Sequence, residues 1–479
     1  MAKYIKFLII LTIFIVSLKK TLEMENDEII IRLQSIIDNK EAPLIGADLA
    51  VIKNNKTLFC DSIGKARLNE DESVNKTSNK FTKYRTASIS KLFTAIAIWQ
   101  LEEKGLLKMT DEASKYLNFN LSNPNFPEIP ITIEKILSHT SSISENGSNY
   151  HIPYEHNISE FFINTSNYYY KDSYSKNEPG FFDYMNINYC LLGTIIENIT
   201  KQRFDIYMTE HVLNPLNITG SYNIYNMSKE VLDEVGTLYY YYYGHWIATT
   251  YNFTKGYPHM DFSNYTIGTN GAIFSPQGGL IVSVDELTHL IYMFINNGTY
   301  NNNKILKPET MEKMFNIFWK YDKQKKNGND NDGYIDAYGR GPQVITNIGR
   351  NRLHKKKNLN VSGHFAFGSG LFGGLFVDRI KGYGFVYRSN GFCGNPDKYV
   401  YDFSPYSKWT IDLIKLADDI GHFEDEINDN GKTYTVYIII AACVVILIVI
   451  VIIIVVIKKK KNKENNNGTI YSPLMKDLE

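Results

Sequence analysis

Cysteine is scarce in this chain of 479 residues, and its scarcity excludes a fold built on disulfides. Of the four cysteines, Cys443 falls inside a long apolar run. The other three, Cys60, Cys190 and Cys393, allow at most one intramolecular disulfide. A Cys60–Cys393 pair and three buried thiols are both compatible with the sequence. In either case a hydrophobic core must stabilise the fold, and 44% hydrophobic residues suffice for one large domain or two intimate subdomains.

A surplus of charge of one sign is also missing. The chain has 51 Lys and Arg residues against 51 Asp and Glu residues, and its central region has no basic stripe. A polyanion would therefore meet no attracting field, and we expect no nucleic-acid partner.

Metal and cofactor motifs are absent as well. His139 and His364 lack a Cys, His or Asp partner at ligand spacing, and no His-x-x-x-His pair occurs. No glycine loop of the kind that cradles phosphate follows a predicted strand. We predict neither a metal site nor a cofactor.

Long apolar runs are confined to the two ends of the chain. Residues 1–20 place Lys3 and Lys6 before an apolar stretch too short to span a bilayer, which predicts a signal peptide. Residues 434–457 contain an uncharged run that is about 33 Å long as a helix, enough to cross a membrane. The lysines that begin at Lys458 place the tail, residues 458–479, in the cytoplasm. We predict a single-pass type I protein whose domain, residues 24–425, is extracellular or lumenal, at the plasma membrane or in endolysosomes.

Two weaker patterns agree with this topology. Asn-x-Ser/Thr sequons recur from Asn55 to Asn360, as expected of a glycosylated ectodomain, although an Asn-rich chain also produces such triplets by chance. The tail holds Tyr471-Ser472-Pro473-Leu474, which resembles the sorting signals that adaptors bind in the cytoplasm. An unstructured tail fits the same four residues, so a sorting adaptor is one of two alternatives there.

Helix and strand patterns follow a definite order between the ends. We predict a helix over 28–39, a hairpin over 46–60, a helix after Arg85, a largely helical stretch over 105–330, strands over 371–377 and 382–389, and a last helix over 407–420. This order predicts an α+β fold, in which an antiparallel sheet is flanked by the terminal helices and an all-helical lobe is inserted between its halves. An active site would lie in the cleft between the lobes.

Two segments of the inserted region have simpler predictions. Residues 320–331 are charged and rich in Asn and Gly, so we expect an exposed loop there. The tyrosine run over 239–243 is typical of a strand with one packed and one exposed face, and lining of the cleft is the alternative.

The stretch after Arg85 carries the first chemical signal. Ser88 lies where a predicted helix begins, and Lys91 lies one turn later on the same face. Backbone N–H groups at a helix N-terminus can stabilise an oxyanion, and a neutral lysine can accept the serine proton. We interpret Ser88 as a nucleophile and Lys91 as its base. An N-cap serine followed by a surface lysine fits the same local pattern, so the other motifs must decide.

Four later segments complete a constellation. They are a helix that ends in His139-Thr140-Ser141, a loop with Tyr184-Met185-Asn186 before a helix, the turn Gly278-Gly279-Leu280, and the run His364-Phe365-Ala366-Phe367. Together with Ser88 and Lys91, they resemble the serine β-lactamase and penicillin-binding protein superfamily, most closely its class C-like branch with eukaryotic hydrolase relatives. The resemblance covers roughly residues 29–420 and implies a β-lactamase-like fold.

The resemblance also implies roles for the Tyr-x-Asn element. The Tyr184 phenol would pass the proton from Ser88 to the leaving group and later activate water, provided that a nearby cation lowers the pKa of the phenol. The Asn186 amide would bond Lys91 and a substrate carbonyl. A buried tyrosine and a turn asparagine are the alternative, and His139 belongs to a structural turn in this family.

The last element departs from the family pattern. His364 fits the first position of the family's Lys/His-Thr-Gly triplet, but Phe365 and Ala366 replace Thr and Gly. The family's second oxyanion donor is the backbone N–H after the triplet, here that of Phe367, which a side-chain change does not remove. The lost hydroxyl counts against β-lactam or D-alanyl-peptide substrates more than against acyl transfer.

The sequence therefore predicts a membrane-anchored serine hydrolase that acts through an acyl-serine intermediate on an ester, amide or peptide. A catalytically inactive receptor or adhesion protein with the same fold is the rival, and transfer of the acyl group to an acceptor other than water is a third alternative.

Overall fold

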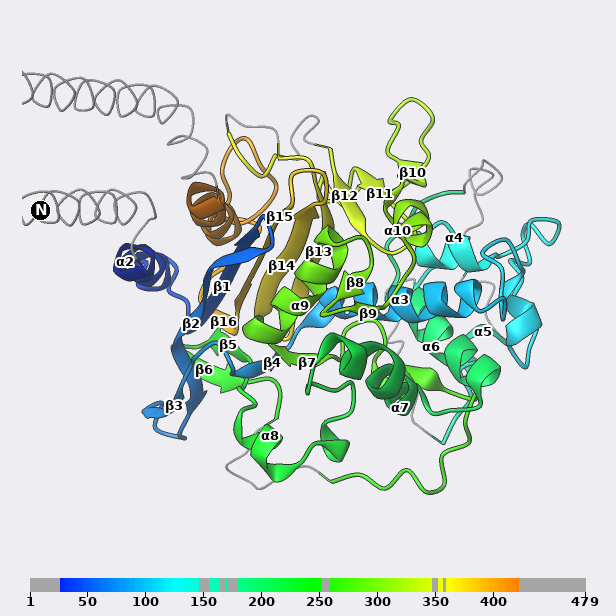
Figure 1. Cartoon of the computed structure of the whole chain (residues 1–479), viewed down its shortest axis with the longest axis horizontal. Helices are drawn as coiled ribbons and strands as arrows, with labels where there is room; N and C mark the ends of the chain where they lie inside the picture. Colours follow the sequence, from blue (N-terminus) through cyan, green and yellow to red (C-terminus); the bar gives the residue numbers. More distant parts are fainter. Residues whose placement is uncertain are drawn as a thin grey trace, which may run out of the picture. The chain divides into compact units, whose positions relative to one another are not determined.

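A nine-stranded antiparallel sheet forms the centre of the computed structural model (Figure 1), and its strand order is β10-β11-β12-β13-β14-β15-β1-β2-β3. The strands are β1 Gly46–Lys53, β2 Lys56–Leu68, β3 Val74–Thr77, β10 Trp319–Lys320, β11 Ala337–Tyr338, β12 Gln343–Ile345, β13 Val361–Gly368, β14 Leu371–Asp378 and β15 Tyr383–Ser389. The first and last thirds of the chain thus meet in one sheet, because β1 pairs with β15. The predicted α+β fold with a large antiparallel sheet is confirmed.

The structure describes residues 26–145, 155–163, 169, 180–251, 259–346, 352–355 and 359–421. The predicted signal peptide, membrane span and tail lie outside these residues and stay predictions. Within the described ranges, no helix has both the length and the apolarity that a membrane crossing needs.

The predicted hairpin near the N-terminus is confirmed as β1 and β2. Its turn residues, Asn54 and Asn55, both have positive φ, at 50° and 59°. A tight turn that matches the twist of two strands needs this left-handed conformation, and asparagine tolerates it better than most residues.

Helices cover the sheet. All eight residues of β1 are buried, which requires cover on both faces. Helix α9 (Val284–Ile295) lies over β14, β15 and β1 (Figure 1). Helix α2 (Asn26–Ile37) packs on β1 and β2, and Arg32 joins it to Asp419 of the terminal helix, residues 408–421. The two predicted flanking helices are therefore present.

The inserted lobe is not all-helical, contrary to the prediction. Its helices are α3 Ser90–Glu103, α4 Ile133–Leu137, α5 Glu160–Ile163, α6 Asn186–Thr200, α7 Phe204–Met208, α8 Lys229–Asp233 and α10 Pro308–Phe315. It also contains the pair β8 (Thr299–Tyr300) and β9 (Asn303–Lys304), and the strands β5 (Tyr239–Tyr242) and β6 (His245–Ala248), which form a sheet with β16 (Gly391–Phe392).

The tyrosine run forms a strand, but not a half-packed one. Only Tyr239 is buried, whereas Tyr240, Tyr241 and Tyr242 are all exposed. The three-stranded sheet is short, and β5 extends beyond the core that covers Tyr239. Buried and exposed side chains therefore do not alternate along β5 as predicted.

The predicted loop over 320–331 is present over 321–331, and only Lys320 differs, because it pairs with Ala337 as the end of strand β10. The cysteine predictions are corrected. Cys60 and Cys393 are free and half-buried, and Cys190 is free and buried, so neither the disulfide nor three fully buried thiols is found.

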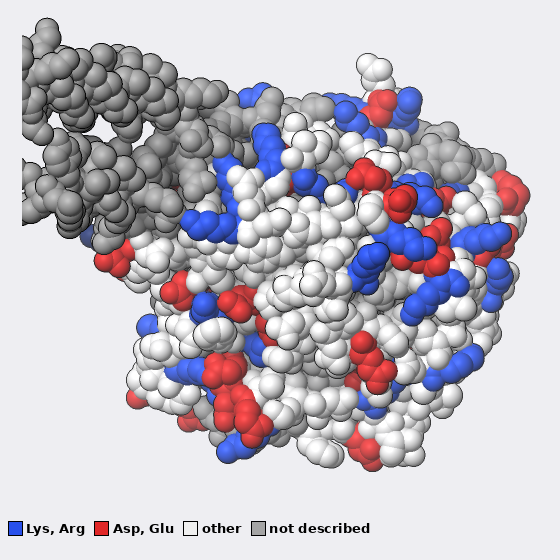
Figure 2. All heavy atoms as spheres, viewed as in Figure 1, with Lys and Arg blue, Asp and Glu red and all other residues white. Residues whose placement is uncertain are grey.

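Basic and acidic side chains alternate over the face seen in Figure 2. Such mixing gives this face no strong field of one sign.

Candidate active site

Ser88 lies in a strained turn between a short strand and the central helix of the lobe. Strand β4 (Lys83–Arg85) leads into the 3₁₀ turn Ala87–Ile89, and α3 continues from it. Ala87 has a φ of 44°, a left-handed conformation that costs an alanine roughly 1 kcal/mol. Thr86 and Ile89 are the N-caps of the turn and of α3, so Ser88 is not an N-cap serine and its hydroxyl is free for other contacts.

The Gly278-Gly279-Leu280 turn holds this strained segment. The Thr86 N–H donates to the Leu280 carbonyl over 2.8 Å, and Arg85 Nε donates to the Gly278 carbonyl over 2.8 Å. Strand β7 (Ile281–Ser283) follows the turn and pairs with β4. The Gly278-Gly279-Leu280 turn therefore fixes the position of the backbone next to Ser88.

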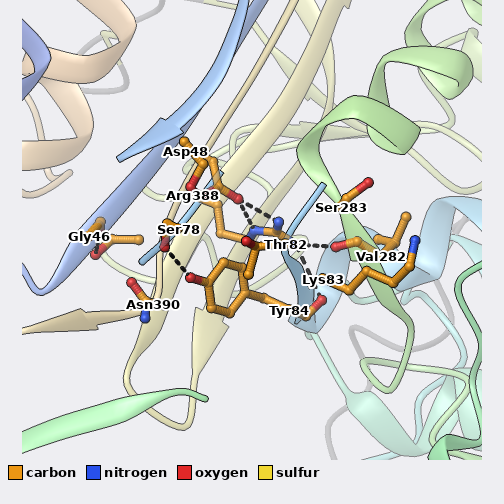
Figure 3. Close-up of polar contacts among 12 residues, drawn as sticks. Gly46, Asp48, Ser78, Thr82, Lys83, Tyr84, Val282, Ser283, Arg388 and Asn390 are labelled. Carbon is orange, nitrogen blue, oxygen red and sulfur yellow. Dashed lines mark hydrogen bonds and ion pairs between the residues drawn. The ribbon is translucent and has the colours of Figure 1, made fainter. Parts of the chain in front are cut away.

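A buried ion pair fixes β4 and β7 to the large sheet (Figure 3). Arg388 of β15 binds the Asp48 carboxylate of β1 through Nε, at 2.8 Å, and through a second guanidinium nitrogen. The same guanidinium donates to the backbone carbonyls of Tyr84 in β4, at 3.2 Å, and Val282 in β7, at 2.9 Å. One side chain thus joins both lobes within a few residues of Ser88.

Lys91 is buried beneath Ser88 without a counter-ion among its hydrogen-bond partners. Its Nζ lies 3.1 Å from Ser88 Oγ, 2.8 Å from Asn186 Oδ1 and 2.8 Å from the Gln277 carbonyl. Its exposed fraction is 0%. Burial lowers the pKa of Lys91 to about 7, although the negative charge of Glu145 acts in the opposite direction. Near pH 7, Lys91 is therefore a neutral amine in a large share of the molecules, and only the neutral form can accept a proton.

Tyr184 approaches Ser88 from the other side. Its hydroxyl donates to Ser88 Oγ over 2.9 Å, and Lys91 Nζ lies 4.9 Å from the centre of its ring. Tyr184 is half-buried, so its hydroxyl can meet both Ser88 and a ligand.

His139 supports the Tyr184 loop from behind. Its Nδ1 accepts the Met185 N–H at 3.1 Å, and its ring lies 4.4 Å from that of Tyr184. Burial lowers the pKa of His139 well below its usual value, and the Lys91 charge acts in the same direction, so the ring is neutral. Its position agrees with the structural turn that the sequence predicts.

Asn186 is the first residue of α6, and an acidic residue outside the motifs fixes that end of the helix. Glu145 Oε1 accepts the Ile187 N–H at 2.7 Å. Burial raises the pKa of the Glu145 carboxyl, whereas the Lys91 charge acts in the opposite direction. Sequence reasoning missed Glu145, because no spacing links it to the Tyr-x-Asn element that it orders.

Strand β13 presents His364 inward and Phe367 outward. His364 Nε2 lies 2.8 Å from the Tyr338 hydroxyl, and the His364 ring lies 5.8 Å from that of Tyr184. Burial and the Lys91 charge lower the pKa of His364 to about 3, so it is a neutral group and not a cation for a substrate. Phe367 is 59% exposed. Strand β12 pairs only with residues 361–363 of β13, which leaves the edge of the strand at Phe367 open on that side.

One cavity of about 460 Å³ joins these groups. Ser88, Tyr184, Asn186, His364 and Phe367 all line it, and Lys91 lies beneath its floor. The predicted site residues thus come together from three separate parts of the chain. No cluster of His, Cys, Asp and Glu in the described ranges could hold a metal ion.

The arrangement has the chemical parts of a serine acyl-transfer site. A hydroxyl is within hydrogen-bond reach of a buried amine and a phenol, and Ser88 and Phe367, the two expected oxyanion donors, line the same cavity.

Comparisons with known proteins agree with this geometry. A profile of the family described as Beta-lactamase matches residues 33–402. Protein flp of Staphylococcus aureus (strain MRSA252) is 31% identical over 201 residues, which are 42% of this chain and 39% of that protein. The putative penicillin-binding protein PbpX of Bacillus subtilis (strain 168) is 34% identical over 165 residues, 33% of this chain and 37% of that protein. The chain thus matches 39% and 37% of the lengths of these curated relatives.

A solved structure shares the fold. The octameric penicillin-binding protein homologue from Pyrococcus abyssi aligns with a TM-score of 0.56 at 21% identity, over 82% of this chain and 77% of that one. Because the family profile covers most of the described domain, the chain belongs to the Beta-lactamase family, whose members are serine hydrolases that act through acyl-enzyme intermediates.

Proposed function

We propose that this protein is a membrane-anchored serine hydrolase that cleaves an ester, amide or peptide through an acyl-Ser88 intermediate. The contact between Ser88 Oγ and the buried amine of Lys91, at 3.1 Å, is the observation that carries the proposal. Lys91 has no carboxylate among its hydrogen-bond partners, and its pKa of about 7 leaves a usable base near neutral pH.

The proposed reaction has two halves. Ser88 Oγ bonds to the substrate carbonyl carbon while its proton moves to Lys91 Nζ, and the N–H groups of Ser88 and Phe367 stabilise the oxyanion. Tyr184 delivers a proton to the leaving alcohol or amine as its bond to the acyl carbon breaks, and protonated Lys91 then returns a proton to Tyr184. Water then attacks the acyl-serine and gives up a proton through Tyr184 and Lys91. The acid leaves, and Ser88 regains its proton.

Covalent labelling of the full-length chain by a fluorophosphonate tests this proposal. We expect labelling that disappears in Ser88→Ala. The chain offers a matched control in Ser73→Ala, since Ser73 and Lys76 form a second Ser-x-x-Lys pattern in which Ser73 is exposed and Lys76 pairs with Glu234 at 3.0 Å. Labelling that persists in Ser88→Ala would exclude Ser88 as the nucleophile.

The rival function is a receptor or adhesion protein that uses the fold without catalysis. Replacement of the family's Thr and Gly by Phe365 and Ala366 favours it. It predicts no labelling of the wild type together with intact ligand binding. Product analysis with added alcohols or amines separates a hydrolase from an acyltransferase.

The anchored topology is part of the same proposal. The apolar residues 434–457 and the lysines after them support a type I orientation, with the domain outside or in a lumen. Protease treatment of sealed microsomes should remove the tail and leave residues 24–425 intact. Digestion of the domain instead would show that the domain faces the cytoplasm, which would contradict the proposed orientation.

A further inference from the structure

The cavity at Ser88 has two chemically different parts. Polar groups surround the nucleophile. Elsewhere the wall consists mainly of aromatic and aliphatic side chains, with the uncharged polar residues Asn331, Gln343, Ser407 and Thr410 among them, and we call this part the apolar arm. It is lined by Tyr334, Ile335, Phe365, Phe367, Phe372 and Tyr406.

The aromatic wall of the apolar arm is a packed structure. The Phe365 ring lies 4.3 Å from that of Tyr406, and the Tyr406 ring lies 5.1 Å from that of Tyr334. The Tyr406 hydroxyl is already bonded to the Tyr334 backbone carbonyl at 2.8 Å. The arm therefore presents mainly ring faces and edges to a ligand.

Charge in the cavity wall disfavours an anion in this arm. Of the residues that line the cavity, Arg85 is the only one with a permanent positive charge, and its Nε is committed to the Gly278 carbonyl. His364 is neutral, because burial lowers its pKa to about 3. The lining residue Asp397 is exposed, and its charge acts on Tyr334 of the arm.

Tyr184 stands where the two parts of the cavity meet. It packs against the same apolar cluster as Tyr334, which also contains Ile335 of the arm. If Tyr184 gives its proton to the leaving group, that group must lie beside Tyr184 and therefore at the mouth of the arm.

We propose that the apolar arm binds the leaving group of the substrate and that this group is an uncharged alcohol or amine with an apolar chain or ring. This inference rests on the proposed hydrolase function. It excludes leaving groups that end in a carboxylate, because such a group would meet aromatic rings and Asp397 instead of a cation.

Two acetate esters of matched chemistry test the inference on the full-length protein. The first is 4-butylphenyl acetate, and the second is 3-(4-acetoxyphenyl)propionate, which has a similar length and a similar phenol leaving group but ends in a carboxylate. We expect kcat/KM for the neutral ester to exceed that for the carboxylate at least tenfold, and also to exceed that for phenyl acetate. Equal values, or a preference for the carboxylate, would overturn the inference.

A charge placed in the arm should change this ratio. Tyr334→Lys keeps the backbone carbonyl that accepts from Gln343 and Tyr406, and it should reduce the ratio at least fivefold. Phe367→Lys, at a side chain that is 59% exposed, is a second variant if the first does not fold. Ile317→Lys is the control, since Ile317 is 49% exposed and lies outside the cavity lining, and it should leave the ratio unchanged. A ratio that stays constant in both arm variants would also overturn the inference.

The two proposals fail in different ways. If no ester is turned over in a Ser88-dependent manner and no fluorophosphonate labels Ser88, the hydrolase function fails. If Ser88-dependent turnover is present but ignores the leaving-group chain, only the assignment of the apolar arm fails.

Discussion

Lys91 and Arg388 are the two most deeply buried cationic side chains among the described residues, and their surroundings differ. Lys91 is 0% exposed and Arg388 is 1% exposed. Arg388 has the Asp48 carboxylate and two backbone carbonyls as partners. Lys91 has a hydroxyl, an amide oxygen and one backbone carbonyl.

The difference in partners separates a buried charge that stabilises the fold from a buried amine that is suited to proton transfer. A paired guanidinium keeps its charge and ties the sheet to β4 and β7. An amine buried without a counter-ion loses part of its charge instead, and the pKa of Lys91 falls to about 7. The fold therefore maintains a charge at Arg388 and a partly neutral amine at Lys91.

The same substitution at both sites gives the sharpest contrast. In Lys91→Met we expect kcat/KM to fall on the order of 10³-fold or more, because no group remains to accept the Ser88 proton. The free energy of unfolding should change less than in Arg388→Met, since removal of a costly buried charge offsets the lost hydrogen bonds. Ester kinetics and urea unfolding measure the two effects. A Lys91→Met enzyme with near wild-type kcat/KM would contradict the assignment of the base.

Arg388→Met should act on stability. It leaves the Asp48 carboxylate buried and unpaired, which costs about 3–5 kcal/mol in the free energy of unfolding. The double variant Asp48→Leu/Arg388→Met should recover much of this loss, because no unpaired charge remains. Urea unfolding of the three variants measures the coupling. If the double variant is less stable than Arg388→Met, the ion pair is not the cause of the loss.

The smallest effects are those of pH. Protonated Lys91 cannot act as a base, so kcat/KM should rise about tenfold per pH unit up to about pH 7 and then level. A rise that continues well past pH 7 without levelling would assign the essential titration to another group.

The free energy of unfolding should also depend on pH, at values above about pH 7. The folded-state pKa of Lys91 lies below its usual value of 10.5, so the unfolded chain binds more protons between about pH 7 and pH 10.5. Lys91 therefore makes the folded state more stable as the pH rises through this range, and Lys91→Met should lack that contribution. Urea unfolding at pH 7 and pH 9.5 compares the two proteins.

Sequence patterns were sufficient for the motif residues and for most elements. The patterns of apolar residues predicted α2, α3 and the terminal helix closely, and the strand patterns over 46–60 predicted the β1–β2 hairpin. Ser88 and Lys91 were predicted together because they lie one helical turn apart. Tyr184 and Asn186 were predicted from the resemblance, since nothing local joins them to a serine almost a hundred residues away.

Other contacts of the site could not be predicted from any pattern in the sequence. The Gln277 carbonyl that bonds Lys91 is a backbone group, which every residue possesses. Glu145 orders the start of α6 from a separate loop, and Asp48 meets Arg388 only because β1 and β15 pair. The exposure of Tyr240–Tyr242 depended on how far the core extends, which alternation within a strand cannot show.

The sequence by itself determined the reactive side chains and the order of the elements, because periodicity and local spacing are properties of the chain. The tertiary structure decided the rest. It buried Lys91 among neutral acceptors, left His364 uncharged, and lined the far part of the cavity with aromatic rings from β13, β14 and the residues around Tyr334 and Tyr406. Burial and charge pairing are set by neighbours that are distant in the sequence, so only the folded chain fixes the protonation state of each group and the substrate that the cavity admits.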